Sequence, residues 1–220
     1  MTAIAIDGPA GAGKSSIARR IAGRLGYIYV DTGALYRAIG LHVLRGGADP
    51  AKEESVRPFL DGLRVSLKFV GGEQRVFLNG EDVSQEIRTA PVSRAASQVS
   101  AIPAVRAFLL SLQRDIAGEN DVVMDGRDIG TVVLPNAPIK IFLTASPEER
   151  ARRRYEQMRK KGMEADYSQV LQDMKLRDYS DSHREISPLV RADDALLVDT
   201  TDNTLEQSVE QLLSLILKRL

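Results

Sequence analysis

The sequence predicts an α/β fold, in which a mostly parallel sheet is flanked by helices, with a small antiparallel sheet inserted into it. Three observations support this prediction. Short apolar strands alternate with amphipathic helices along most of the chain, a glycine-rich turn follows the first strand, and residues 63–78 change to an apolar period of two. At 220 residues, the chain is expected to form a single unit over 1–220.

The first elements alternate between strand and helix. Residues 2–6 form a short apolar run that ends in the glycine-rich turn, and residues 14–25 place apolar side chains on one face at helical spacing. A second apolar run at 27–30 leads into a helix expected from Asp31, a typical capping residue, to about Arg45. Strand–helix units at this spacing imply a parallel sheet with right-handed crossovers.

The pattern changes between residues 60 and 86. Apolar and polar residues alternate over 63–69, Gly71-Gly72 predicts a turn, 75–78 predicts a return strand, and Asn79-Gly80 predicts a second tight turn. We therefore predict an antiparallel insertion at 60–86 on the substrate side of the fold. The core is then expected to comprise residues 1–59, 87–147 and 163–220.

The α/β pattern returns after the insertion. The expected elements are a helix at 103–118, strands at 121–124, 139–143 and 195–198, a charged helix from Ser146 to Gly162, a helix at 166–183 and a C-terminal helix. Two helix starts are well marked, because Ser146 precedes Pro147 and Glu149, and Thr204 lies three residues before Gln207.

Composition excludes several classes of protein. The chain has 30 basic and 30 acidic residues, no cysteine and two histidines, which excludes disulfides, thiolate catalysis and cysteine-based metal sites. The zero net charge disfavours a dedicated nucleic-acid binder, and no apolar run approaches the roughly 18 residues of a membrane helix. Without a signal-like start or a heptad seam, we expect a cytoplasmic monomer with neither a membrane nor a nucleic acid as partner.

Residues 8–15, Gly-Pro-Ala-Gly-Ala-Gly-Lys-Ser, match the P-loop pattern. Its glycines let backbone N–H groups face phosphate oxygens, and the following helix N-terminus adds positive potential. Lys14 is expected to reach the β- and γ-phosphates, and the Ser15 hydroxyl can ligate Mg²⁺. The sequence thus predicts a P-loop NTPase-type fold with a nucleotide-phosphate site at Gly8, Pro9, Ala10, Gly11, Ala12, Gly13, Lys14, Ser15 and Ser16.

The guanine-recognition motif of GTPases is absent, and the chain is too short for a transporter-type or motor ATPase. A small phosphotransferase with its own acceptor pocket remains. Arg37, in the first turn of its expected helix, and Arg127, after a strand, lie at the carboxyl edge of the sheet, where ligands bind. The alternatives are a solvated charge for Arg37 and a strand-end ion pair between Arg127 and Asp128.

Arg177, Asp181 and Arg184 are spaced so that they share one helix face. Two guanidinium groups beside one carboxylate could bind a phosphate while the carboxylate accepts sugar hydroxyls. An exposed salt-bridge face is the alternative.

The stretch 148–162 is strongly basic, with seven Arg and Lys side chains from Arg150 to Lys161 and Glu156 as the only acid among them. It is interpreted as a mobile lid over the polyphosphate. Two alternatives remain open: an RNA or anionic-surface contact, and a solvated helix face with Glu148–Arg152 and Glu149–Arg153 pairs.

Beyond these patterns, the chain resembles the bacterial cytidylate kinases, a family of nucleoside monophosphate kinases, over nearly its whole length. The resemblance rests on residues 6–14, 31–37, 79–83, 87–89, 96–100, 125–133 and 187–189. The Asp-Gly-Arg-Asp run at 125–128 and the Asn-Gly-Glu-Asp-Val run at 79–83 are highly specific together. The resemblance implies transfer of the γ-phosphate of ATP to CMP or dCMP with Mg²⁺, and a fold with a lid and an enlarged acceptor-binding region.

The resemblance also implies roles for individual residues. Ser97, Arg106 and Asp128 match positions that read cytosine. Thr32, Arg37 and Arg127 match contacts to the acceptor nucleotide, mainly its phosphate. Arg177, Asp181 and Arg184 match the face that holds phosphate and ribose. Lys14, Arg127 and Asp128 form the expected catalytic set, and Ser15 is the expected metal ligand.

Many relatives carry serine where this chain has Thr32; a hydroxyl is retained, so we expect tuning of binding rather than its loss. A kinase for UMP or AMP, an RNA-associated P-loop factor and an ATP-binding module without transfer activity are the alternatives that remain.

Overall fold

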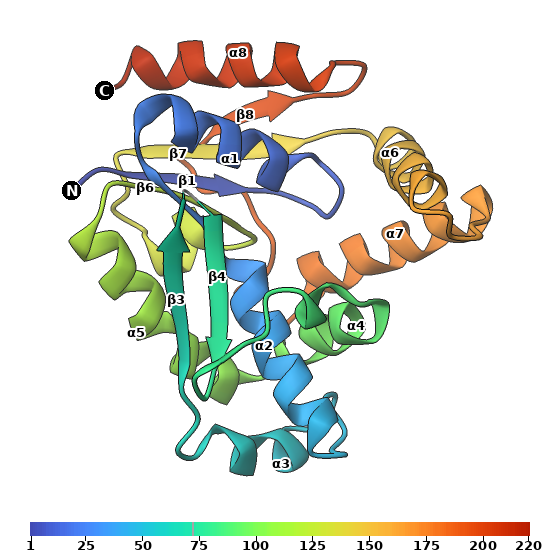
Figure 1. The fold of residues 1–220 in the computed structure, drawn as a ribbon. Coiled ribbons are helices and arrows are strands. Elements are labelled where there is room, and N and C mark those ends of the chain that lie inside the picture. The colour runs from blue at the N-terminus through green and yellow to red at the C-terminus, as the bar shows by residue number, and fades with distance from the viewer. Residues whose placement is uncertain (72) are drawn as a thin grey trace. The chain divides into compact units, whose positions relative to one another are not determined.

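The structure is a computed structural model that describes residues 1–71 and 73–220, so the Gly72 half of the predicted Gly71-Gly72 turn lies outside the described residues. The chain divides into two compact units (Figure 1). The first unit comprises Met1 and Tyr27–Val122, and the second comprises Thr2–Gly26 and Val123–Leu220.

The second unit contains four strands of the larger, five-stranded sheet. They are β1 (Ala3–Asp7), β6 (Val122–Gly126), β7 (Ile139–Thr144) and β8 (Leu196–Asp199), in the spatial order β6-β1-β7-β8. The pairs β1–β7 and β7–β8 are parallel, with Ile4 opposite Ile139 and Ile141 opposite Leu196. The predicted parallel sheet is therefore confirmed, and its strands are the near-continuous apolar runs expected of strands buried on both faces.

The helices of the second unit begin close to the predicted residues. They are α1 (Lys14–Leu25), α6 (Pro147–Lys160), α7 (Tyr167–His183) and α8 (Leu205–Leu217), whereas a π-helical turn at Ile129–Val133 was not predicted. Thr204 and Gln207 form the expected capping box, and the Ser146 side chain accepts a hydrogen bond from the Glu149 N–H. Helix α8 packs beside α1, and α7 packs beside α6 (Figure 1).

The first unit contains strand β2 (Ile28–Asp31) and the small sheet. Its other elements are α2 (Thr32–Arg45), α3 (Glu53–Val56), a 3-10 turn at Arg57–Leu60, β3 (Val65–Val70), β4 (Glu73–Leu78), β5 (Glu81–Asp82), a 3-10 turn at Glu86–Arg88, α4 (Ala90–Val99) and α5 (Pro103–Glu119). Strands β3 and β4 form the predicted antiparallel pair (Figure 1), and β5 adds a third antiparallel strand beside β4. Asn79 and Gly80, both with positive φ, make the predicted tight turn between β4 and β5.

Helix α4 and strand β5 were not predicted. Helix α4 is short and small-residue rich, and it is stabilised mainly by packing against α2. The two helices approach so closely that a Cβ at Gly40 would lie 2.9 Å from the backbone nitrogen of Ala96. Buried side chains from α2, α4, α5 and the small sheet form the core of this unit.

Within the described ranges, no single helix combines the length and apolar character of a membrane span. Helices α4 and α5 reach that length and composition only when they are taken together, and the chain bends by 98° between them.

Candidate active site

The loop between β1 and α1, in the second unit, has the backbone that phosphate binding requires. Gly8 has φ +147°, and a Cβ there would lie 1.9 Å from the carbonyl oxygen of Leu143 on β7. Gly13, the N-cap of α1, has φ +90°. No other residue type fits at Gly8, because the loop crosses directly over the β7 backbone. The loop therefore ends at a helix N-terminus, where backbone N–H groups can bind an anion.

Lys14, the first residue of α1, is 5% exposed, and its ammonium donates a 2.8 Å hydrogen bond to the carbonyl oxygen of Pro9. Burial lowers the pKa of Lys14 to about 7, and the charge of Arg127 acts in the same direction. Asp125 and Asp7 act in the opposite direction. A polyanionic ligand beside this buried ammonium would stabilise its charged form.

Ser15 and Asp125 bring two oxygen ligands together. The Ser15 hydroxyl donates a 3.0 Å hydrogen bond to Oδ2 of Asp125, which lies on β6 and is 4% exposed. Oxygen ligands of this kind suit Mg²⁺, which binds one or two protein groups together with phosphates and waters. The described residues hold no group of three or more His, Cys, Asp or Glu side chains that could hold a metal. The prediction named Ser15 but missed Asp125, whose place at the end of a buried strand near the P-loop was the available signal.

Asp7, at the end of β1, was also missed. Its carboxylate accepts hydrogen bonds from the backbone N–H groups of Ile129 at 2.8 Å and Gly130 at 2.7 Å. These bonds hold the segment that directly follows Asp128 against the strand that leads into the P-loop. Burial raises the pKa of Asp7 to about 6, even though the two backbone hydrogen bonds lower it.

Arg127 and Asp181 are brought together although they lie 54 positions apart in the sequence. Arg127 Nε donates a 2.8 Å hydrogen bond to Oδ2 of Asp181, and a wider ion pair of 3.9 Å joins Arg184 to Asp128. Burial alone would raise the pKa of Asp181, but the charges of the neighbouring arginines, led by Arg127, and the Arg127 hydrogen bond together lower it. Asp181 therefore stays ionised among guanidinium groups, which is an arrangement suited to a phosphate and a sugar.

Two details of this cluster differ from the prediction. Helix α7 ends at His183, so Arg184 lies just beyond the helix in extended backbone instead of on its face. Strand β6 continues to Gly126, so Arg127 directly follows the strand instead of lying three residues beyond it. In both cases the chain leaves regular structure at the arginine, which lets its side chain reach a partner that the helix or strand geometry would not place beside it.

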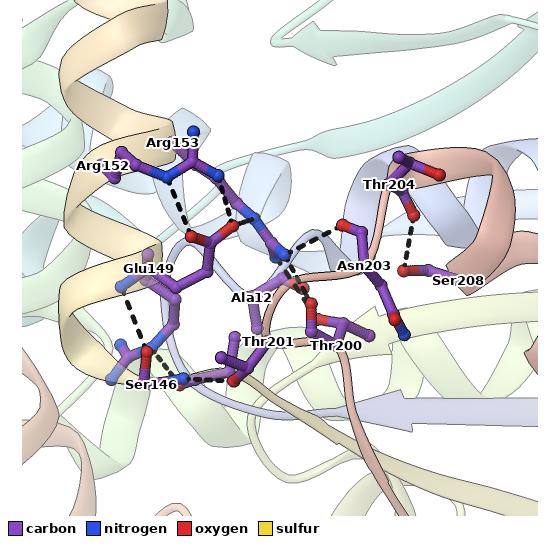
Figure 2. Close-up of polar contacts among 12 residues, drawn as sticks. Ala12, Ser146, Glu149, Arg152, Arg153, Thr200, Thr201, Asn203, Thr204 and Ser208 are labelled. Atoms are coloured by element: carbon purple, nitrogen blue, oxygen red, sulfur yellow. Dashed lines mark hydrogen bonds and ion pairs between the residues drawn. The ribbon is translucent and has the colours of Figure 1, made fainter.

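The basic side chains of helix α6 make more contacts within the protein than the sequence indicates. Figure 2 shows Glu149 between two arginines, with hydrogen bonds of 2.8 Å from Arg152 Nη2 and 2.7 Å from Arg153 Nε. Arg153 also donates to the backbone oxygens of Thr200, at 2.6 Å, and Asn203, at 3.4 Å. These bonds tie α6 to the loop between β8 and α8.

The predicted Glu149–Arg153 pair is confirmed, but the predicted Glu148–Arg152 pair is wrong. Arg152 instead binds Glu149 and Glu156, and Glu148 pairs with Lys175 of α7. Packing of α7 along α6 supplies a partner that helical spacing could not indicate. Arg154, Arg159, Lys160 and Lys161, toward the end of the helix, are exposed.

In the first unit, the predicted phosphate-binding residue Arg37 is paired with Asp31. Arg37 Nη2 donates a 2.7 Å hydrogen bond to Oδ2 of Asp31, which also caps α2 by accepting from the Ala34 N–H. The side chain of Gln74 on β4 accepts a 2.8 Å hydrogen bond from the Asp31 N–H, so the small sheet supports this pair. Helix α2 begins at Thr32, which places Arg37 in its second turn instead of the predicted first turn.

The other predicted acceptor residues of this unit, Ser97 and Arg106, lie near the turn between α4 and α5. Arg106, 8% exposed, donates a 3.0 Å hydrogen bond to the backbone oxygen of Ser100 and lies 5.6 Å above the ring of Tyr36. The Ser100 hydroxyl donates to the backbone oxygen of Ser97 at 2.8 Å. Thr32, also predicted, is 3% exposed as the first residue of α2.

The second unit thus has the fold and the loop of a P-loop phosphotransferase: a parallel sheet, a glycine-rich turn before α1, and a buried lysine beside arginine–carboxylate pairs. Comparison with known proteins gives the family. The family model described as cytidylate kinase matches residues 4–218, and the chain belongs to this family.

Individual relatives agree with the family match. The chain is 50% identical to the cytidylate kinase of Caldicellulosiruptor saccharolyticus, over 98% of this chain and 95% of the relative. It is 54% identical to the cytidylate kinase of Caldanaerobacter subterraneus subsp. tengcongensis, over 98% and 94%. Among solved structures, an uncharacterized protein from Eubacterium ventriosum aligns over 100% of both chains with a TM-score of 0.54 and 13% identity, which supports the fold alone.

The predicted family, fold class and activity are therefore confirmed. The chain is an ATP-dependent nucleoside monophosphate kinase that phosphorylates CMP and dCMP.

Proposed function

We propose that separate groups of residues bind the donor, the metal and the acceptor when this chain transfers the γ-phosphate of ATP to CMP or dCMP. Residues 8–16 bind the phosphates of ATP, with Lys14 on the transferring group. The observation that carries this proposal is the buried Lys14 at the N-terminus of α1, directly after the glycine-rich loop. Phosphoryl transfer passes through a loose transition state that needs positioning and positive charge more than covalent help.

Ser15 and Asp125 would hold Mg²⁺, which would supply positive charge to the phosphate oxygens when it is bound. Support comes from the 3.0 Å hydrogen bond between their oxygens and from the burial of Asp125 beside the P-loop serine. Asp125→Asn should weaken Mg²⁺ binding, measured by titration calorimetry in the presence of a nonhydrolysable ATP analogue. An unchanged Mg²⁺ affinity in this variant would contradict the assignment.

The acceptor nucleotide would be bound through its phosphate by Arg37, Arg127, Arg177 and Arg184, and through its sugar by Asp181. Thr32 would add a hydroxyl contact. Ser97, Arg106 and Asp128 would recognise the cytosine, whose amino group is a hydrogen-bond donor where uracil has a carbonyl acceptor. A pocket built from acceptors for that donor disfavours UMP, because the acceptors would be left unpaired.

Residues 148–162 would act as a lid that excludes water from the transferring phosphate. The exposed basic side chains in the second half of α6 support this role, since they have few internal partners among the described contacts. Residues 60–86 would contribute the acceptor-binding insertion, and we propose that the enzyme acts as a cytoplasmic monomer without nucleic-acid or membrane partners. Gel filtration at micromolar concentration tests the oligomeric part of this proposal.

The assay that tests the activity follows ADP release from ATP and Mg²⁺ with CMP, dCMP, UMP, AMP, GMP or no acceptor. We expect strong stimulation by CMP and dCMP and weak stimulation by the others. A rate of ADP release that is the same with every acceptor and without one would contradict the acceptor assignments. That result would favour an ATPase or a binding module.

A further inference from the structure

Arg150, in the first turn of α6, is a buried arginine whose three nitrogens all donate hydrogen bonds near the P-loop. Its side chain is 4% exposed. Nε donates to the backbone oxygen of Ala145 at 2.9 Å, and Nη1 donates to the backbone oxygen of Ala10 at 3.0 Å. Nη1 and Nη2 also bind the two carboxylate oxygens of Asp178 on α7, at 3.0 and 2.6 Å. One guanidinium therefore joins three segments of the second unit.

The contact with Ala10 bears on phosphate binding. When the N–H groups of a P-loop converge on a phosphate, some of its carbonyl groups point outward and need donors from the protein. Arg150 supplies such a donor in the middle of the loop. The next residue, Gly11, is pressed against the same helices, since a Cβ there would lie 3.2 Å from Cβ of Arg150 and 3.1 Å from Cε of Met174.

The contact with Asp178 bears on the acceptor residues. Asp178 directly follows Arg177 and lies one helical turn before Asp181 on α7. Its bidentate bond to a buried guanidinium is the strongest type of side-chain link, with a defined planar geometry. Any rotation or shift of α7 that moved Asp181 would have to strain this link.

We propose that Arg150 and Asp178 form a positioning pair, which holds the Ala10 peptide of the P-loop against α7. The pair thereby fixes the position of the P-loop relative to the acceptor-binding residues of α7. The pair acts through other residues and does not itself need to contact either nucleotide. This inference rests on the roles proposed above for residues 8–16 and for Arg177 and Asp181.

A direct role of Arg150 on ATP is the main competing interpretation, and Asp178→Asn separates the two. The variant keeps the shape of the side chain but removes its charge and one acceptor. If Arg150 acted directly on ATP, loosening its internal bond would leave kcat/KM for ATP unchanged or raise it. A positioning role requires kcat/KM to fall for both ATP and CMP, by about tenfold or more, because misplacing reacting groups by about 1 Å costs up to 10²-fold.

Arg150→Gly with added guanidinium ion provides a second readout. We expect kcat to fall by on the order of 10² and guanidinium to restore at least a tenfold part of it, because the ion can occupy the vacated site between Ala10 and Asp178. The matched control is Arg24→Gly, which removes an arginine from the exposed α1–α8 ion pair with Glu210 in the same unit. The control should keep wild-type activity and should not respond to guanidinium.

Rates are to be expressed per folded enzyme, measured by circular dichroism, so that unfolding is not counted as lost activity. Wild-type kcat/KM in folded Asp178→Asn would overturn the proposal, and so would a deficit of Arg150→Gly that guanidinium leaves unchanged. If Arg150→Gly does not fold, Asp178→Asn alone decides the outcome. The wild-type assay keeps this result apart from the proposed function, since failure of CMP to stimulate the wild-type enzyme would contradict the function and not the pair.

Discussion

Two arginines of this kinase, Arg37 in the first unit and Arg150 in the second, are bonded in different ways. The Arg37 side chain is 26% exposed and makes its ion pair with Asp31 through Nη2, while its buried Nε has no hydrogen-bond partner among the described residues. The Arg150 side chain is 4% exposed, and all three of its nitrogens donate to protein oxygens.

This difference separates arginines that can receive a ligand from arginines that hold the protein together. A guanidinium carries five N–H donors, so one ion pair leaves donors available for a phosphate, whereas a guanidinium bonded on every nitrogen has little to offer. Arg127 lies between these two cases, since its side chain is 21% exposed, Nε makes the ion pair with Asp181, and Nη1 donates a 3.3 Å hydrogen bond to the backbone oxygen of Gly126. The number of remaining donors, more than the position in a basic stretch, is therefore the useful criterion.

Lys14→Ala should have the largest effect, because among the described residues Lys14 donates to one carbonyl oxygen, that of Pro9, which leaves donors for the transferring phosphate. We expect kcat to fall by on the order of 10² or more, through lost stabilisation of transition-state charge. Steady-state kinetics with saturating ATP and CMP measure this effect. Near wild-type turnover would remove Lys14 from the catalytic set.

Arg37→Ala should raise KM for CMP by about 10- to 100-fold, the cost of losing hydrogen bonds to a charged group, with little change in the melting temperature. Arg45→Ala is the matched control, since Arg45 on the same helix pairs only with the exposed Glu81 and Glu86 among the described contacts. Equal KM values for CMP in the two variants would contradict the distinction between arginines that can receive a ligand and arginines that hold the protein together.

Asp181→Ala should raise KM for CMP by roughly tenfold while changing KM for ATP less, because the carboxylate is assigned to the sugar of the acceptor. Initial rates over a matrix of both nucleotides give the two constants. The alternative outcome, in which both KM values rise equally, would indicate that the variant acts through the Arg127 contact and the folding of the cluster.

Asp7 should affect stability, and its stabilising contribution should be smallest at neutral pH. Its pKa is raised from 3.8 to about 6 in the folded protein, so the folded state binds more protons than the unfolded state between these values. The Asp7 contribution is fully present below about pH 4 and is lost as the pH rises through 6, by about 3 kcal/mol.

Urea unfolding of the wild type and of Asp7→Asn between pH 4 and 6.5 isolates this contribution, because other groups titrate equally in both proteins. The difference in unfolding free energy, wild type minus variant, should decrease across this range. A difference that stays constant with pH would show that Asp7 keeps its ordinary pKa in the folded protein.

Local patterns were sufficient for much of the fold. The turn at Asn79-Gly80, the capping box from Thr204 to Gln207 and the helix start at Ser146 were predicted from short sequence signals and are confirmed. Helix α4 was not predicted, because its stability depends on close packing against α2 at Gly40.

The sequence by itself determined the P-loop, because phosphate recognition there depends on consecutive backbone N–H groups and on glycines that act within eight residues. Together with the longer runs of similarity, it also determined the family. Only the tertiary structure decided which arginines keep donors for a ligand and which are bonded to the protein. The bonds within the protein join distant residues, such as Arg150 with Ala10, 140 positions away, and with Asp178, 28 positions away. Such contacts depend on how α6 and α7 pack against the loop, and helical spacing alone contains no information about that packing.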